Sequence, residues 1–163
     1  MLLRRIDDSR LAQYAYLIGC QKTGEAIIFD PERDVDRYLD LAKRENLRIV
    51  AVAETHIHAD FLSGARELAE RVGAHVYVSA EGGPDWQSKW AKGYAHTLLR
   101  SGDTFKVGNI EFRAVHTPGH TPEHMMYLVT DRGSGMDQPM GMFSITNINS
   151  VRPNVLCNSA GFT

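Results

Sequence analysis

Apolar residues recur along the chain in short runs with two different spacings. Strand-like runs at residues 11–20 and 26–29 flank the turn Lys22-Thr23-Gly24-Glu25 and predict a hairpin. Residues 48–54 are expected to form the central strand. Their continuous apolar run, Ile49–Ala53, indicates burial on both faces, with helices on both sides of the sheet. Further strands are expected at residues 75–78 and 125–129, and a second hairpin over residues 104–115, about Gly108-Asn109.

Helical spacing of apolar residues predicts two helices, at residues 34–45 and from about Phe61 to residue 72. Asp34 is expected to cap the first helix and Asp60 the second. Residues 81–93 are interrupted by glycine and proline and carry Trp86 and Trp90, whose indoles we expect to pack on the body of the protein rather than to form a pocket rim. Strands interspersed with helices, without an internal repeat or linker, predict one α/β domain.

Composition narrows the class of protein. The chain has 163 residues and a formal net charge of −2, which does not favour a nucleic-acid or anionic-membrane surface. No stretch approaches the roughly 18–20 apolar residues that span a bilayer. The N-terminus turns acidic at Asp7-Asp8, where a signal peptide needs its apolar core, so we expect a cytoplasmic protein. Cys20 and Cys157 are then expected to stay reduced, with Cys20 packed in the core.

The candidate chemistry follows the central apolar run, where open α/β sheets bind ligands. His56 and His58 lie two residues apart, which directs both imidazoles to one side of the chain, and Asp60 adds a carboxylate. Pro118-Gly119 restricts the backbone that enters His120. We therefore predict His56, His58 and His120 as metal ligands.

Asp60 and the remaining histidines are less constrained by their spacing. Besides capping a helix, Asp60 is a candidate catalytic residue, as a partner of the metal ligands or as a base toward bound water. His75 and His96 stand among unrelated residues and are expected to be ordinary hydrogen-bonded side chains. His116 and His124 flank the Pro-Gly turn, and the pattern leaves a ligand role open for both.

Two histidine motifs, Thr55-His-Ile-His-Ala-Asp60 and Thr117-Pro-Gly-His120, resemble those of the metallo-β-lactamase-fold superfamily. The resemblance extends from the first hairpin to about Ser144. It implies an αββα sandwich, mainly its N-terminal half. The sequence of residues 54–68 looks closest to that of the persulfide dioxygenases, including the type fused to rhodanese domains. Glyoxalase II-type thioester hydrolases are the neighbouring branch of the superfamily.

The resemblance also implies a metal and a substrate. The wider family has a further histidine where this chain has Phe61, so a single iron(II) fits better than a two-metal hydrolytic centre, with zinc as the alternative. His56 and His120 would be iron ligands, with His58 and Asp60 close by. The substrate would be a small-molecule thiol or persulfide, glutathione persulfide, which O2 oxidises to sulfite.

The chain departs from the family after residue 144. The family has a further motif, Phe-Ser/Thr-Gly-Asp, whose aspartate is a metal ligand. This chain matches its first two residues at Phe143-Ser144 but has Ile145-Thr146 in place of the glycine and aspartate. Asp131 and Asp137 are the nearby carboxylates that could replace it. We therefore expect a partial domain over residues 1–144 and an atypical, truncated or altered tail over residues 145–163. An incomplete sandwich favours homo-oligomers, because it leaves apolar sheet surface uncovered.

Three functions remain open on the sequence. The first is persulfide dioxygenase-type oxidation, with metal binding weakened by loss of the carboxylate. The second is hydrolysis of a glutathione thioester at a metal centre of the glyoxalase II type. The third is a non-catalytic metal-binding remnant.

Overall fold

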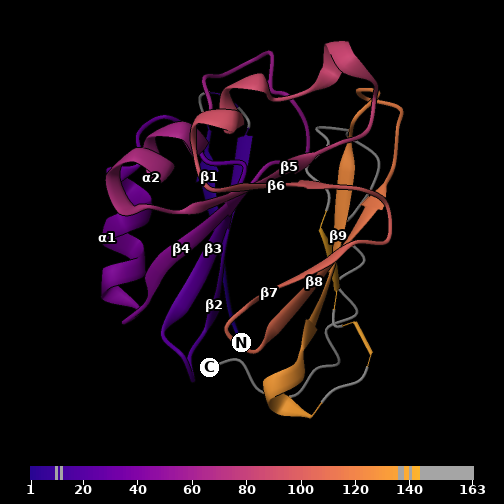
Figure 1. The fold of residues 1–163 in the computed structure, drawn as a ribbon. Coiled ribbons are helices and arrows are strands. Elements are labelled where there is room, and N and C mark those ends of the chain that lie inside the picture. The colour runs from indigo at the N-terminus through magenta and orange to yellow at the C-terminus, as the bar shows by residue number, and fades with distance from the viewer. Residues whose placement is uncertain (10, 12, 136–137, 140, 144–163) are drawn as a thin grey trace.

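The computed structural model describes residues 1–163 except 10, 12, 136–137, 140 and 144–163. Figure 1 shows three layers: two helices, a first sheet and a second sheet. The strands are β1 (Leu2–Asp8), β2 (Gln13–Cys20), β3 (Glu25–Phe29), β4 (Arg48–Ala53), β5 (His75–Ser79), β6 (His96–Leu99), β7 (Thr104–Val107), β8 (Ile110–His116), β9 (Met125–Asp131) and β10 (Gly141–Phe143). The helices are α1 (Asp36–Arg44) and α2 (Ala65–Val72), with short 3₁₀ turns η1 (Pro84–Trp86), η2 (Lys89–Gly93) and η3 (Arg132–Ser134).

The first sheet has six strands in the order β1-β2-β3-β4-β5-β6, and the second has four in the order β10-β9-β8-β7. The two predicted hairpins are confirmed, since β2 pairs antiparallel with β3 and β7 antiparallel with β8. Strands β3 to β6 run parallel to one another. The carboxyl ends of β4 and β5 therefore meet at one edge, which is the edge that carries the first histidine motif.

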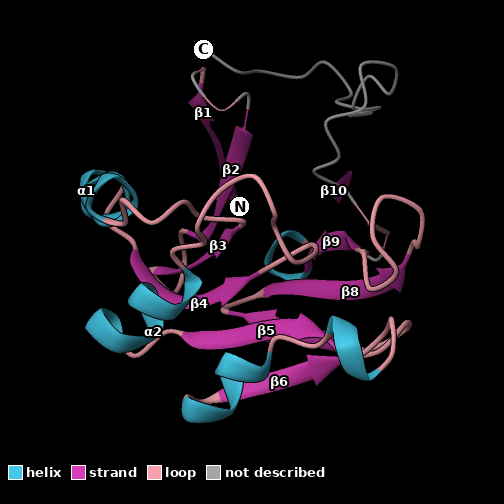
Figure 2. Ribbon diagram, turned by 90° about the horizontal axis from the view of Figure 1, so that it is seen from above, coloured by secondary structure: helices cyan, strands magenta, loops and turns pink. Residues whose placement is uncertain are grey.

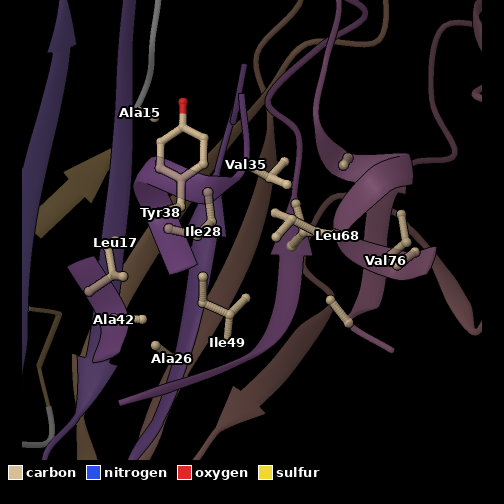
Figure 3. Packing of buried hydrophobic residues seen from close by; sticks show 14 of the residues in the cluster. Ala15, Leu17, Ala26, Ile28, Val35, Tyr38, Ala42, Ile49, Leu68 and Val76 are labelled. Atoms are coloured by element: carbon tan, nitrogen blue, oxygen red, sulfur yellow. The ribbon is translucent and has the colours of Figure 1, made fainter. Parts of the chain in front are cut away.

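Helices α1 and α2 cover one face of the six-stranded sheet (Figures 1 and 2). In Figure 3, Tyr38 and Ala42 of α1 face the aliphatic side chains of β2 and β3, and Leu68 of α2 lies near β4 and β5. Tyr38 and Leu68 are completely buried. The helical spacing of apolar residues in the sequence is thus used to close this half of the core.

The opposite face of the six-stranded sheet packs on the second sheet, not on helices as the sequence predicts. Phe29 of β3 meets Phe112 of β8 with ring centroids 5.5 Å apart, and Phe105 stacks on Tyr77 of β5 at 3.8 Å. A continuous apolar run shows that a strand is buried on both faces, but it does not show what covers each face. The α/β sandwich arrangement itself agrees with the expected fold class.

Both helices begin later than predicted, and neither predicted cap is formed. Helix α1 has Val35 at its N-cap and α2 has Gly64, without a side-chain capping hydrogen bond in either case. The Asp34 and Asp60 caps were therefore wrong. The Gly64 N–H donates to the carbonyl of Pro31, and Ser63 bridges to Glu32, so residues before Ala65 are held to the loop after β3 instead of the helix.

Gly64 is required by close packing. A Cβ added there would contact the carbonyl oxygen of Glu32 and lie 2.7 Å from Cγ1 of Val35. We expect Gly64→Ala to lower the free energy of unfolding by about 2–3 kcal/mol, because the loop after β3 must shift to admit the methyl group. Urea denaturation measures this change. Gly93→Ala is the matched control, since its added Cβ meets no atom within 4 Å, and equal destabilisation by both substitutions would contradict the packing argument.

Within the described residues, no helix is long and apolar enough to cross a lipid bilayer. Cys20 is a buried free thiol, as expected, whereas Cys157 lies outside the described part of the chain.

Candidate metal centre

The two histidine motifs lie beside each other where the sheets meet. The first motif follows β4 directly, and the second forms the connection between β8 and β9. The Met125 N–H at the start of β9 donates to the Thr55 carbonyl at 2.7 Å, and the Tyr127 hydroxyl donates to the Glu54 carbonyl at 3.0 Å. These two hydrogen bonds join the second sheet to the end of β4, and they bring together segments about 70 positions apart.

His56 is the central member of a cluster of imidazole rings. Its centroid lies 4.1 Å from that of His58, 4.8 Å from His120 and 5.4 Å from His124. The three histidines singled out from the sequence therefore converge, and His124, whose role the spacing left open, is the fourth member. His56 and His124 are buried, whereas His120 is exposed at the opening of the cluster.

Asp30 organises the first motif, a role that no sequence pattern indicated. Its side chain is completely buried and accepts hydrogen bonds from the Thr55 N–H at 2.7 Å and the Thr55 hydroxyl at 2.8 Å. His58 Nε2 lies 3.0 Å from Asp30 Oδ1, an ion-pair contact whose direction departs from ideal hydrogen-bond geometry. From the sequence, Asp30-Pro31 only marked the end of a strand. Its backbone adopts a left-handed φ of 47°, which is uncommon for a residue other than glycine.

Hydrogen bonding assigns which ring nitrogens are available. The Thr55 hydroxyl has one proton, which it gives to Asp30, so its oxygen accepts the Nδ1 proton of His56 at 2.9 Å. This leaves the Nε2 lone pair of His56 free. In His58, Nε2 faces Asp30 and Nδ1 is the nitrogen that remains. A carboxylate behind an imidazole is the usual support of a metal-ligating histidine.

Burial and charge separate the protonation states of the two histidines. Burial, followed by the charge of His58, lowers the pKa of His56 to about 4, so His56 is neutral near pH 7 and can act as a ligand. Burial also disfavours charge on His58, but Asp30 outweighs burial and the pKa of His58 is raised. Burial opposes ionisation of Asp30, yet His58 and Thr55 hold its pKa below the usual value.

Two buried carboxyl groups, those of Glu54 and Glu123, share a small cavity with His56. Burial raises the pKa of Glu54 to about 7, although a hydrogen bond from the Ser63 hydroxyl opposes the shift. Glu123 is 1% exposed and accepts a hydrogen bond from the Ile57 N–H. Together with His56 and Trp86, both line a cavity of about the size of one water molecule. Trp86 therefore faces a cavity, against expectation, whereas Trp90 packs on the helical core as predicted.

The low pKa of His56 predicts a pH-dependent contribution to the stability of the metal-free protein. The unfolded chain binds a proton at His56 near pH 6.5, whereas the folded state binds it only near pH 4. The contribution of the neutral ring is therefore complete above pH 6.5 and is lost between pH 6.5 and 4, by about 3 kcal/mol. Glu54 acts in the opposite direction, because its raised pKa makes it stabilising at low pH and costs stability as the pH rises through 7.

The measurement that isolates His56 is therefore a difference. Urea unfolding of the wild-type protein and of His56→Gln, at pH 7 and pH 4, should give a stability gap that changes by about 3 kcal/mol between the two pH values. The gap between the wild-type protein and the exposed control Lys92→Gln should stay constant. A gap for His56→Gln that does not depend on pH would show that burial does not hold His56 neutral.

The other candidate residues fall into two groups, histidines with hydrogen-bond partners of their own and residues beside the histidine cluster. His75 pairs with the Thr97 hydroxyl, His96 with the Tyr94 carbonyl, and His116 with the Pro122 carbonyl, so these three are ordinary hydrogen-bonded side chains. Asp60 is exposed beside the cluster, where its charge contributes to the raised pKa of His58. The Phe61 ring lies 4.3 Å from that of His58 and adds an apolar wall.

Asp131, one of the two carboxylates considered as replacements for the missing family ligand, does not enter the cluster. Asp131 is the last residue of β9, at the other end of the strand from Met125. Its carboxylate binds the amino group of Met1 at 2.9 Å and accepts a hydrogen bond from the Gly133 N–H. It was therefore wrong as a candidate ligand. Asp137 and Ser144 lie outside the described residues. No group of three or more His, Cys, Asp or Glu side chains within the described ranges is already arranged to hold a metal ion.

The layered α/β/β fold with two histidine motifs at the sheet edge defines a class of metalloprotein fold. The sequence profile of the metallo-β-lactamase superfamily matches residues 8–133, and the chain belongs to this superfamily. Both the fold and the resemblance expected from the sequence are thereby confirmed.

Similarity to individual members spans part of their length. The crystal structure of a metallo-β-lactamase from Staphylococcus aureus is 46% identical, with a TM-score of 0.85 over 88% of this chain and 43% of that chain. The mitochondrial persulfide dioxygenase ETHE1 of Bos taurus is 28% identical, covering 80% of this chain and 49% of its own length. The hydroxyacylglutathione hydrolase of Nitrosococcus oceani is 33% identical, covering 69% of this chain and 40% of its own. The chain thus spans about half the length of the curated relatives that it matches.

Proposed function

We propose that this protein is a metal-dependent enzyme of the persulfide dioxygenase type, in which His56, His58 and His120 bind one iron(II) ion. The observation that carries the proposal is the convergence of these three rings, with the apolar ring of Phe61 packed beside them. The relatives with glutathione derivatives in their names support a small-molecule thiol as the substrate class.

The donor set fits a divalent cation in its chemistry. His56 is neutral and has a free Nε2, and His58 offers Nδ1 because Asp30 holds its other nitrogen. His120 is exposed and can adjust to a ligand. Imidazole suits iron, zinc, nickel and copper alike, so the donor set alone does not select iron. Phe61 does favour one metal over two, because a phenyl ring cannot serve as a ligand.

The reaction would consume glutathione persulfide, O2 and water and release glutathione, sulfite and two protons. The sulfur–sulfur bond breaks, and the outer sulfur is oxidised by O2. The metal, when bound, would supply the site at which O2 and the persulfide sulfur are activated. Of the chain's own residues, Asp30 would keep the two histidines oriented and Phe61 would exclude water from one side. Asp60 would accept a proton at its carboxylate from a bound thiol or water.

Thioester hydrolysis at a zinc centre is the second candidate function. It is supported by similarity to hydroxyacylglutathione hydrolases, and the same histidines would hold the metal. The sequence after Ser144 lacks the Gly-Asp of the family's Phe-Ser/Thr-Gly-Asp motif. This supports the third candidate function, a metal-binding module without turnover. Self-association of the chain and a cytoplasmic location remain predictions.

Metal content and substrate turnover distinguish the three functions. Protein purified without added metal is analysed for iron and zinc, and O2 uptake is recorded with glutathione persulfide, with sulfite as the measured product. One iron per chain with persulfide-dependent O2 uptake is the expected result. Two zinc ions with cleavage of a glutathione thioester would establish the second function instead, and bound metal without either turnover would establish the third.

A further inference from the structure

The buried side chain of Glu123 connects the segment after His120 to the first histidine motif through a hydrogen bond. It follows His120 by three residues and directly precedes His124, and its side chain is 1% exposed. Its Oε1 accepts from the Ile57 N–H at 2.8 Å, across 66 residues of sequence. Ile57 is the residue between His56 and His58. A carboxylate three residues after the second motif is thus bound to the backbone at the centre of the first motif.

Among the described residues, the other hydrogen bonds to the backbone of the first motif lie on the Thr55 side of the two histidines. Thr55 donates its N–H to Asp30, and its carbonyl accepts from the Met125 N–H. These bonds fix the peptide groups before His56. The orientation of the Ile57 peptide decides how the chain turns between the two rings, and Glu123 is the side chain that binds this peptide. Metal sites need such support, because small errors in ligand direction weaken binding.

We propose that Glu123 is a positioning residue, which fixes the directions of His56 and His58 by holding the Ile57 amide. It touches neither the substrate nor the metal in this role. The inference rests on the proposed function insofar as the histidines are metal ligands, but the hydrogen bond itself is a property of the metal-free chain.

The surroundings of Glu123 indicate that the arrangement has a cost in stability. Its Oε2 is buried and has no hydrogen-bond partner among the described residues. Gly82, with φ of 80°, packs so closely that an added Cβ would lie 2.8 Å from Cβ of Glu123. A buried carboxylate with one unpaired oxygen is unfavourable by itself. Departures of this kind are expected at functional sites more than in structural packing.

Holding the sheets together does not require Glu123. The Met125 N–H and the Tyr127 hydroxyl already join β9 to residues 54 and 55. A purely structural role for Glu123 would therefore appear as a loss of stability without a change at the histidines. A positioning role would appear at the ring nitrogens and in metal affinity.

The test uses Glu123→Leu, which removes the acceptor, and Glu123→Gln, which retains an oxygen acceptor of the same reach. Amide hydrogen exchange of Ile57 is measured by NMR in metal-free protein, and cobalt(II) affinity and the cobalt(II) visible spectrum are measured by titration. We expect Ile57 exchange to be about ten- to a hundredfold faster in Glu123→Leu. Cobalt(II) should bind about ten- to a hundredfold more weakly, with an altered spectrum. Glu123→Gln should stay close to wild type in all three.

Glu81 provides the matched control, because it also accepts a backbone N–H, that of Ser101 at 3.1 Å, but does so at the surface. Glu81→Leu should change neither metal affinity nor spectrum.

If Glu123→Leu does not fold, Glu123→Asp, which is one methylene too short to reach Ile57, takes its place. Fast Ile57 exchange with unchanged cobalt(II) affinity and spectrum would overturn the proposal, as would slow exchange in Glu123→Leu or a Gln variant as impaired as Leu. Failure of wild-type protein to bind any metal would instead refute the proposed function, while the exchange data would still report on the hydrogen bond.

Discussion

Replacing His56 with alanine is expected to weaken metal binding by about a hundred- to a thousandfold, and His120→Ala should have an effect of similar size. A four-ligand structural zinc site is worth about 10–16 kcal/mol, so one ligand accounts for several kcal/mol. His56 is the central ring, in contact with His58, His120 and His124. Its removal deprives the site of the one imidazole that faces all the others. Elemental analysis and cobalt(II) titration of the purified variants measure the effect.

His75→Ala and His96→Ala are the controls for these two variants. Both residues are partly exposed and bind Thr97 and the Tyr94 carbonyl, away from the cluster. They should retain wild-type metal content. Equal metal content in His56→Ala, His120→Ala and the wild-type protein would remove those histidines from the site, and the proposed enzymatic function would go with them.

Asp30→Ala is expected to lower the free energy of unfolding by about 3–5 kcal/mol, as removal of one partner of a buried ion pair does. The substitution leaves the Thr55 N–H and the Thr55 hydroxyl without their acceptor, and it leaves His58 without its carboxylate. Alanine must also adopt the left-handed φ of 47°, which costs about another 1–2 kcal/mol. Metal affinity should fall in parallel, because both ring orientations depend on this carboxylate.

Urea denaturation of metal-free protein at pH 7 measures the stability effect. Asp30→Asn should be milder, because asparagine tolerates the left-handed conformation and keeps one acceptor oxygen. Asp40→Ala, on the exposed side of α1, should change stability by less than about 0.5 kcal/mol. Because the pKa of Asp30 is lowered, its contribution should be present above pH 4 and disappear as the pH falls further. A loss for Asp30→Ala no larger than that of Asp40→Ala would show that Asp30 does not hold the motif together.

Besides the layer that covers the second face of the six-stranded sheet, the sequence did not predict the edge strands of that sheet or the helix starts. Within the described part of the chain, strand β1, which carries Arg4, Arg5 and Asp7, pairs only with β2. The four-residue strand β6 likewise pairs only with β5. With one neighbour each, these strands need no strong apolar pattern. The start of α2 moved to Ala65 because the preceding residues bind Pro31 and Glu32 instead. Tertiary hydrogen bonds override helical spacing at such a position.

The sequence by itself determined the central strand, both hairpins and the two histidine motifs, because alternation, turn residues and ligand spacing are local properties of the chain. Only the tertiary structure decided that Asp30 and Glu123 support those motifs. Their partners, Thr55 and Ile57, lie 25 and 66 residues away, and the contacts exist because parallel strands and a second sheet end at the same edge. A carboxylate after a strand and a glutamate in a turn carry no periodic signal, so their burial depends on the packing of layers that no local pattern records.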